Sequence, residues 1–174
     1  MHLNLNDEVA WASPQTMLAQ SFWIYDRAGT TLFFHEWQPQ ASKKAMSSFE
    51  ERAKLVQGLI WSLKSLAATV DPTSVTNKQM GTPMRIGEAC SFKSFTSGDE
   101  YTLHMMEMPS GIVFALFTAV GVGDLSEVLR DLYANLYVEL VVKNPEFVVG
   151  NPFQFDSFLQ GLNKRLMAVR LVGS

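Results

Sequence analysis

Short strand-like runs alternate with longer runs of helical spacing along this chain. Within residues 21–37, two β-rich runs flank the polar segment 26–29, which predicts a β-hairpin with Gly29 at a turn position of positive φ. Three more strands are predicted at 86–95, 101–108 and 111–119. Turn residues at 96–99 and 109–111 join these strands as hairpins.

Three helices are predicted between and after these strands. The first spans 49–70, where apolar residues recur at steps of three and four until Asp71 and Pro72 end the pattern. The second runs from 125 to about 142 and stops before Pro145, which disfavours helical geometry in the preceding residue. A shorter third helix covers about 153–167.

The resulting order, ββαβββαα, predicts an α+β fold with a five-stranded antiparallel sheet, because short hairpins make most of the strand connections. Residues 22–25 and 112–117 are apolar at every position, as expected of central strands covered by helices on both faces. Residues 90–95 are more polar and predict an edge strand. We expect residues 1–20 to be an N-terminal extension and residues 21–170 a single domain.

Composition and charge narrow the classes of function. The chain has 174 residues, of which 47% are hydrophobic and 18% charged, with a net charge of −3. No stripe of Lys and Arg is present, which argues against nucleic acid as a partner. A single cysteine, Cys90, favours a reducing compartment. The N-terminus lacks the features of a signal peptide and the longest apolar run, 111–123, is too short to span a bilayer, so we expect a soluble cytosolic protein.

The segment 121–127, "GVGDLSE", invites comparison with a phosphate-binding loop because a Gly-x-Gly pair enters a helix. The third glycine position holds Ser126, however, and no lysine follows in the Walker pattern. The favoured interpretation is a capping box, with Asp124 as N-cap and Glu127 three residues later.

The histidines suggest no catalytic group. His35 and Glu36 are adjacent in a strand and therefore face opposite sides of it, and His104 lies among methionines. The sequence contains no Cys/His cluster with metal-ligand spacing and no Gly-x-Ser-x-Gly motif. We therefore expect neither an enzyme nor a cofactor site.

The first helix has an unusual second face. Leu55, Leu59 and Leu66 form a flank beside its core stripe, and Trp61 points well away from that stripe. Gly58 lies nearby, although a mid-helix glycine costs about 1 kcal/mol relative to alanine. Either Trp61 folds over a loop of its own domain, or it anchors a partner that approaches closely at Gly58.

The second helix, projected at an α-helical period, places Glu139 and Lys143 on the same side as its core leucines. Tyr137, Val138, Val141 and Val142 then face away from the sheet, where the third helix and another subunit would share their coverage. Glu139 and Lys143 are expected to form an ion pair. The predicted partner interface comprises Leu55, Gly58, Leu59, Trp61, Tyr133, Tyr137, Val138, Glu139, Val141, Lys143 and Asn144.

Four segments carry a family resemblance. "GVGDLSEVLRDLYANLYVELVVKNP" (121–145) closely resembles the smallest longin-like core subunit of TRAPP, the transport protein particle that tethers vesicles. "IYDRAGTTLFFHEW", "KLVQGLIWSLKSL" and "YTLHMMEMPSGIVFALFT" match the same family in the same order. The resemblance covers roughly residues 21–150. The extension before the first strand, Ala119 in place of an acidic residue, and the tail after Asn151 depart from the family pattern.

The resemblance implies a longin (SNARE-like) fold with one helix on one face of the sheet and two on the other. It also implies a scaffold subunit without a cofactor, which lies beside a second longin-like subunit and a palmitate-binding-fold subunit. The assembled complex would promote nucleotide exchange on a Rab GTPase in ER-to-Golgi transport. The subunit would then be cytoplasmic and would reach Golgi or ER-exit membranes only through the complex.

Two other classes remain open from the sequence. One is another longin-type trafficking module, either an adaptor small subunit or a SNARE-like regulatory domain. The SNARE alternative lacks a downstream heptad segment and membrane anchor, and the adaptor alternative lacks the "LYVELVVKNP" match. The other class is a small-molecule enzyme on a profilin-like sheet, for which no residues converge on a site.

Overall fold

Five strands form one antiparallel sheet in a computed structural model, which describes residues 17–37, 48–70 and 93–173. The strands lie in the order β2-β1-β5-β4-β3, and every neighbouring pair is antiparallel. Their bounds are β1 Ala19–Tyr25, β2 Thr31–Glu36, β3 Ser94–Ser97, β4 Tyr101–Glu107 and β5 Val113–Thr118. The predicted sheet is confirmed, with β5 at its centre.

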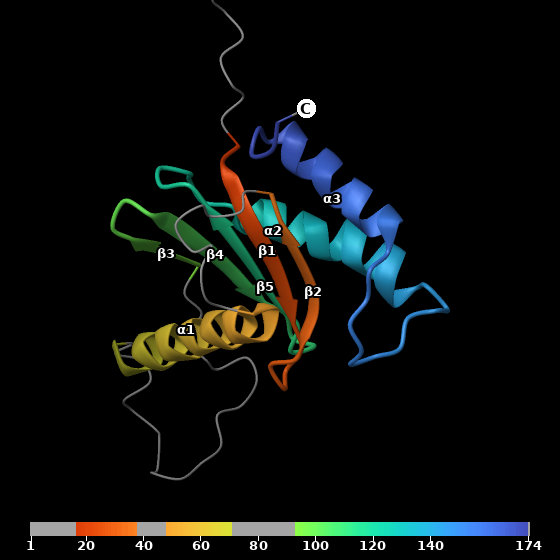
Figure 1. Ribbon diagram of the computed structural model, residues 1–174, viewed down its shortest axis with the longest axis horizontal. Coiled ribbons are helices and arrows are strands. Elements are labelled where there is room, and N and C mark those ends of the chain that lie inside the picture. The colour runs from red at the N-terminus through yellow and green to blue at the C-terminus, as the bar shows by residue number, and fades with distance from the viewer. Residues whose placement is uncertain (1–16, 38–47, 71–92, 174) are drawn as a thin grey trace, which may run out of the picture.

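Helices cover both faces of the sheet. On one face lies α1 (Phe49–Val70); on the other lie α2 (Ser126–Leu132), the π-helix η3 (Tyr133–Val142) and α3 (Asp156–Ala168). Figure 1 shows this three-layer arrangement with α1 alone on its side. The predicted α+β longin-type fold and the limits of the first helix are confirmed.

Two apolar cores follow from the alternation of side chains along the central strands. Trp23 and Tyr25 pack with Ile60 under α1, whereas Phe22 and Ile24 pack under α2, η3 and α3. Every residue of β5 is buried, because this strand contributes to both cores. The uninterrupted apolar run that predicted a central strand is therefore explained by burial on two faces.

The predicted turn between β1 and β2 is confirmed. Gly29 has a φ of 84°, which is accessible to glycine at no steric cost. The Asp26 side chain accepts hydrogen bonds from the backbone N–H groups of Ala28 at 2.9 Å and Thr30 at 2.7 Å. In this Asx turn the Asp26 carboxylate takes the place of a backbone acceptor for two N–H groups between the strands.

The edge strand β3 differs in position from the prediction. Thr96 and Ser97, which we predicted to be in the turn, belong to β3 and pair with β4. The Thr96 and Thr102 hydroxyl oxygens lie 3.2 Å apart, a cross-strand contact that stabilises the longer ladder. The first part of the predicted strand, 86–92, lies outside the described residues, as do the predicted loops at 38–47 and 71–85 and residues 1–16 of the extension.

The packed structure extends slightly past both expected domain limits. Strand β1 begins at Ala19, and Leu171 and Val172 are buried in the core beyond α3. The backbone N–H groups of Leu18 and Ala19 donate to the Leu171 carbonyl at 2.9 and 2.7 Å. None of the helices in the described ranges has the length and apolar character needed to cross a bilayer.

Candidate partner interface

The inner side of α1 is held to the sheet by apolar packing and two ion pairs. Ile60 is buried, and Val56 and Leu63 pack partly buried against the same core. Arg52 pairs with Glu36 of β2 at 2.7 Å, and Lys64 pairs with Glu107 of β4 at 2.6 Å. These contacts at both ends of the helix determine which face of α1 points outward.

The outer side of α1 carries large apolar side chains in solvent. Leu55 is 70% exposed, Trp61 71% and Leu66 59%. Gly58 is also exposed, and a Cβ atom added there would contact nothing within 4 Å. Leu59 is half-buried between this face and the core beneath it. Trp61 is therefore not folded against its own domain within the described ranges, and the predicted notch at Gly58 is open.

The second predicted patch is built differently, because the helix after Leu132 is a π-helix. In it the N–H of Lys143 donates to the Val138 carbonyl, five residues earlier, at 3.1 Å. Wider turns place Leu132, then Leu136 with Tyr137, then Val141 on one face, whereas an α-helix would bring Glu139 and Lys143 there. The α-helical projection of this segment was wrong for that reason.

Tyr137 and Val141 face the protein's own core, and the prediction that they face away from the sheet is wrong. Tyr137 is 3% exposed and Val141 0%. The Tyr137 ring meets Phe114 of β5 edge-on, with 5.6 Å between ring centroids, and burial raises the pKa of its hydroxyl to about 12. Neither side chain offers surface to a partner.

Glu139 and Lys143 lie in solvent instead of on the sheet side. Their predicted ion pair is confirmed, with 2.6 Å between the Lys143 Nζ and a Glu139 carboxylate oxygen. Of the remaining predicted interface residues, Tyr133, Val138 and Asn144 are partly buried. Tyr133 stacks on Tyr137 with a centroid separation of 5.8 Å.

A loop after η3 exposes further apolar side chains that the sequence analysis did not single out. Val148 is 60% exposed and Val149 88%, and Val142 at the end of η3 is 51% exposed. An apolar triplet, 147–149, between a proline and a glycine was the available signal. Val148 and Val149 therefore add exposed apolar surface after the end of η3, whereas Phe147 packs against the core.

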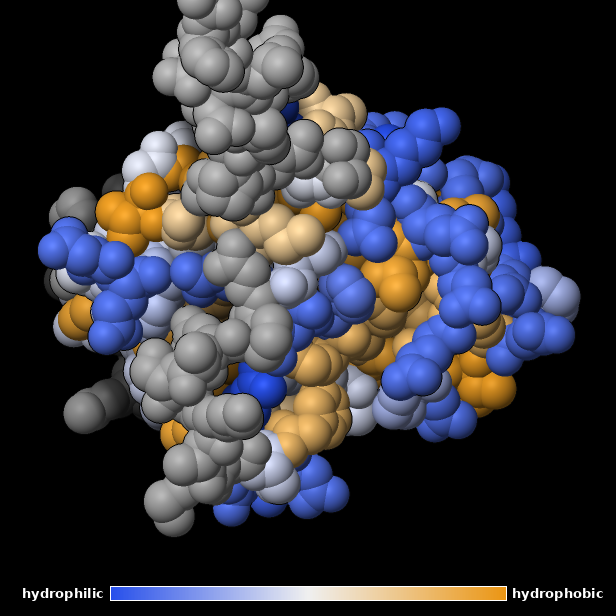
Figure 2. Space-filling view, turned by 45° about the horizontal axis from the view of Figure 1, so that its top comes forward, coloured by the Kyte–Doolittle hydropathy of each residue, from blue (hydrophilic) through white to orange (hydrophobic). Residues whose placement is uncertain are grey.

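The outer surface of α3 is unlike that of α1. Asp156, Ser157, Gln160 and Lys164 of α3 are exposed. Figure 2 shows mainly hydrophilic side chains on the right, where α3 lies in Figure 1, with apolar side chains between them. This helix face is an ordinary solvent-exposed surface.

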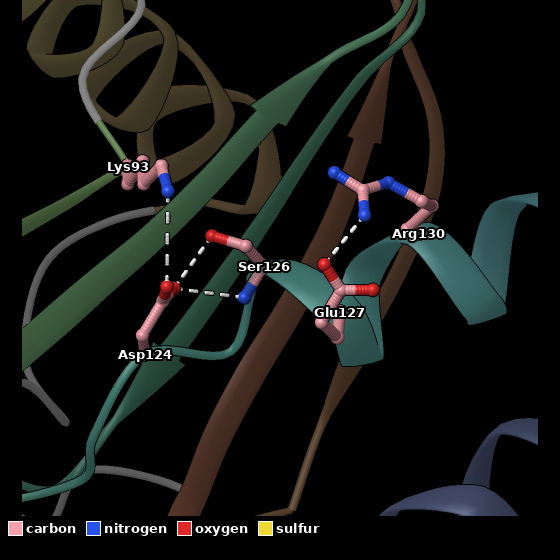
Figure 3. Close-up of polar contacts among 5 residues, drawn as sticks. All are labelled: Lys93, Asp124, Ser126, Glu127 and Arg130. Atoms are coloured by element: carbon pink, nitrogen blue, oxygen red, sulfur yellow. Dashed lines mark hydrogen bonds and ion pairs between the residues drawn. The ribbon is translucent and has the colours of Figure 1, made fainter.

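The side chain of Asp124 holds a local turn before α2. The Asp124 carboxylate accepts from the Ser126 N–H at 2.9 Å and from the Ser126 hydroxyl, as Figure 3 shows. These bonds are the main reason why the pKa of Asp124 is lowered. The predicted capping box is wrong: α2 begins at Ser126 with Leu125 as its N-cap, no side chain makes a capping hydrogen bond, and Glu127 pairs with Arg130. The Glu127 carboxylate therefore binds the exposed Arg130 side chain instead of the backbone N–H of Asp124.

Possible catalytic groups are dispersed in the described part of the chain. His35 meets Trp37 edge-on, whereas Glu36 pairs with Arg52, so the two neighbours point apart as predicted. Residues 17–37, 48–70 and 93–173 contain no group of three His, Cys, Asp or Glu side chains that could hold a metal ion.

Comparison with known proteins identifies the family. Residues 19–169 match the Sybindin-like family. Trafficking protein particle complex subunit 1 of Homo sapiens is 32% identical over 147 residues, covering 84% of this chain and 90% of the relative. The subunit of the same name from Dictyostelium discoideum is 29% identical, covering 82% and 90%.

A yeast relative carries a similar name. Trafficking protein particle complex subunit BET5 of Saccharomyces cerevisiae is 31% identical over 129 residues, covering 71% of this chain and 72% of the relative. The resemblance to a TRAPP subunit predicted from the four sequence segments is thus confirmed. From its fold and from matches that span nearly all of its described length, we conclude that this chain belongs to the Sybindin-like family.

Proposed function

We propose that this chain is a non-catalytic core scaffold subunit of a vesicle-tethering complex of the trafficking protein particle type. The relatives described above are all named as subunits of such a complex. The structural observation that carries the proposal is the outer face of α1, where Trp61 is 71% exposed beside Leu55 and Gly58. Large apolar side chains in water contribute nothing to the stability of an isolated chain, and they would become favourable when a partner covers them.

The outer face of α1, defined as Leu55, Gly58, Leu59, Trp61 and Leu66, is suited to a neighbouring subunit. Tryptophan is a common interface anchor because its large ring is buried at little conformational cost. Gly58 weakens an isolated helix but allows another backbone to approach closely. Such an approach would bury Trp61 and Leu55 on either side of the contact.

A second contact area in this proposal lies at the end of η3. It retains Tyr133, Val138, Glu139, Lys143 and Asn144 from the sequence analysis and adds exposed Val142. Tyr137 and Val141 are no longer included, because their side chains are buried in this chain. We expect the second longin-like subunit and the palmitate-binding-fold subunit to occupy these surfaces.

The activity in this proposal belongs to the assembled complex. By its sequence resemblance, the complex promotes nucleotide exchange on a Rab GTPase in ER-to-Golgi transport and acts at Golgi or ER-exit membranes from the cytoplasm. The chain contributes shape and contacts, and the ion pairs of Arg52, Lys64 and Lys143 are ordinary structural ones. The membrane is reached indirectly and no cofactor is needed.

The test is co-assembly with TRAPP core subunits. Trp61→Ala should leave the circular dichroism of the chain unchanged and weaken binding by about 2 kcal/mol, or about 30-fold. Gly58→Ala should stabilise the isolated chain by about 0.5–1 kcal/mol and still weaken assembly. Met167→Ala, at a 40% exposed position on α3, is the matched control and should change neither quantity.

The readouts are co-purification and the rate of nucleotide release from the Rab. Complexes that contain the wild-type chain should accelerate release, whereas the chain alone should not. If Trp61→Ala and Gly58→Ala assemble like the wild type, the outer face of α1 is not the interface. If the wild-type chain binds no core subunit, the proposed function itself is wrong.

A further inference from the structure

A buried histidine lies on the sheet face under the start of α2. His104 of β4 is 2% exposed and pairs across the sheet with Leu116 of β5 and Ser94 of β3. Directly opposite residues of neighbouring strands share a face, so His104 lies on the same face as Leu116, which belongs to the core under α2, η3 and α3. The mechanism of partner binding proposed above does not use this residue.

The hydrogen bonds around His104 select one tautomer of its ring. The His104 Nε2 atom lies 3.1 Å from the Thr118 hydroxyl oxygen. That hydroxyl donates its single proton to carbonyl oxygens, of Ala119 at 3.1 Å or Thr102 at 3.4 Å. Since carbonyl groups only accept, the hydroxyl is left as the acceptor for His104. On this hydrogen-bond pattern we assign the hydrogen atom of the neutral ring to Nε2.

The other ring nitrogen has no partner. His104 Nδ1 is the one buried side-chain nitrogen or oxygen atom without a hydrogen bond among the residues that the structure describes. In the neutral ring it is an unprotonated acceptor. Protonation would turn it into a buried N–H donor, for which residues 17–37, 48–70 and 93–173 provide no acceptor and whose charge is poorly solvated.

Among the residues that the structure describes, few charges lie near the ring. Before α2, Asp124 is exposed, and its carboxylate lies 3.9 Å from the Lys93 ammonium group, which precedes β3. Figure 3 shows the ion pair between these two side chains. From β5 the ring faces Leu116 and Thr118, which are uncharged. The negative charge of Asp124 is thus screened by solvent and partly offset by Lys93.

We propose that His104 is a pH-sensitive switch. The polar corner is defined as Thr102, His104, Thr118 and Asp124, where β4 and β5 meet the start of α2. Neutral His104 keeps β4 in contact with the start of α2 at this corner, and acidification breaks that contact. On acidification the ring gains its proton at Nδ1. When the protonated ring moves from its buried position into water, water accepts a hydrogen bond from the Nδ1–H group and solvates the positive charge. The contact between β4 and the start of α2 is then lost before the rest of the domain unfolds.

The direction of the effect follows from the pKa of His104, which burial lowers below 6.5 and Asp124 raises less strongly. A group whose folded pKa is depressed in this way binds its proton more readily in the open state. Its contribution to stability is therefore complete above pH 6.5 and is lost as the pH falls below that value. The pKa of Asp124 is lowered from 3.8, so this carboxylate remains ionised throughout that window.

The test is amide hydrogen exchange of the full chain between about pH 7.5 and about pH 5.5, after correction for the intrinsic pH dependence of exchange. Amides of β4 and the start of α2 should open more often as the pH falls, by at most about tenfold per pH unit for a single proton. Imidazole nitrogen NMR should show the Nε2–H tautomer at neutral pH. It should also show His104 titrating below pH 6.5.

Two variants isolate the residue. His104→Gln keeps a side-chain donor for Thr118 but does not titrate, so the pH dependence at the corner should disappear. His35→Gln, at a partly exposed histidine on the opposite edge of the sheet, should retain it. The inference is overturned by a charged ring or an Nδ1–H tautomer at neutral pH, or by equal pH dependence in wild type and His104→Gln. If His104→Gln does not fold, the NMR titration of His104 and the amide hydrogen exchange of the wild-type chain test the inference without it.

Discussion

At the scale of single residues, the end of α3 contains a backbone conformation that its side chain disfavours. Arg170 has a φ of 59°, the left-handed region that most residues other than glycine avoid. It follows the last turn of α3, where the Arg170 N–H donates to the Met167 carbonyl and the Leu171 N–H to the Leu166 carbonyl, both at 2.9 Å. This is a Schellman ending, in which glycine is the usual residue.

Replacing Arg170 by glycine should therefore stabilise the protein. The left-handed conformation costs a residue with a Cβ about 1–2 kcal/mol, and the greater freedom of glycine in the unfolded chain offsets part of that. We expect Arg170→Gly to raise the free energy of unfolding by about 0.5–1 kcal/mol, measured by urea denaturation. Arg170→Ala keeps the Cβ and should show no such gain; an equal gain in both would assign the effect to the lost charge.

At the scale of elements, the π-helix η3 decides which side chains reach the core. Leu136, Tyr137 and Val141 are the buried residues of η3, and Gly161 allows α3 to pack closely against this helix. A Cβ atom added at Gly161 would lie 2.3 Å from a Leu136 methyl carbon. Arg165 of α3 pairs with Asp131 of α2 and donates to the Asn135 carbonyl of η3 at 3.2 Å, which joins α3 to both helices.

A pair of adjacent substitutions tests this arrangement. Val141→Asp places a carboxylate at a position with 0% exposure, whereas Val142→Asp places it at one that is 51% exposed. An uncompensated buried charge costs about 3–5 kcal/mol, so Val141→Asp should unfold or strongly destabilise the isolated chain. Val142→Asp should change stability by less than about 0.5 kcal/mol.

The measurement is thermal unfolding followed by circular dichroism. Similar melting temperatures for the two variants would contradict the difference in burial between Val141 and Val142. Reduced binding of a folded Val142→Asp chain to core subunits would support the second contact area. Unchanged binding would restrict the interface to α1.

At the scale of the whole molecule, the segment after α3 closes the fold onto its first strand. Leu171 is 3% exposed and Val172 7%, and the Leu171 carbonyl accepts two hydrogen bonds from the beginning of β1. Strand β1 pairs with both β2 and β5. Residues near opposite ends of the described chain thereby share one core.

A chain that ends at Arg170 should consequently be less stable throughout. It loses two buried aliphatic side chains, each worth about 1.5–3 kcal/mol, and the acceptor for two backbone N–H groups. We expect a loss of about 3 kcal/mol or more in the free energy of unfolding from urea denaturation. A chain that ends at Val172 is the control and should match the full chain, while equal stability of all three chains would show that this closure contributes nothing.

Local patterns in the sequence were sufficient for most of the elements. The limits of α1 follow from apolar spacing and from Asp71 and Pro72, and the β1–β2 turn follows from Gly29, because both signals act over a few residues. The exposed position of Trp61 was also predictable, since α1 is a regular α-helix. The four segments that resemble a TRAPP subunit predicted the fold class and the family.

Tertiary structure decided the features that depend on helix type or on distant residues. An α-helical period was assumed for 133–142, and only packing against Phe114 and α3 shows that Tyr137 and Val141 face the core. The length of β3 depends on its pairing with β4, and the closure at Leu171 depends on β1, far away in the sequence. The tautomer of His104 depends on Thr118 in another strand. In each of these cases the stabilising contact joins residues that the chain brings together only on folding.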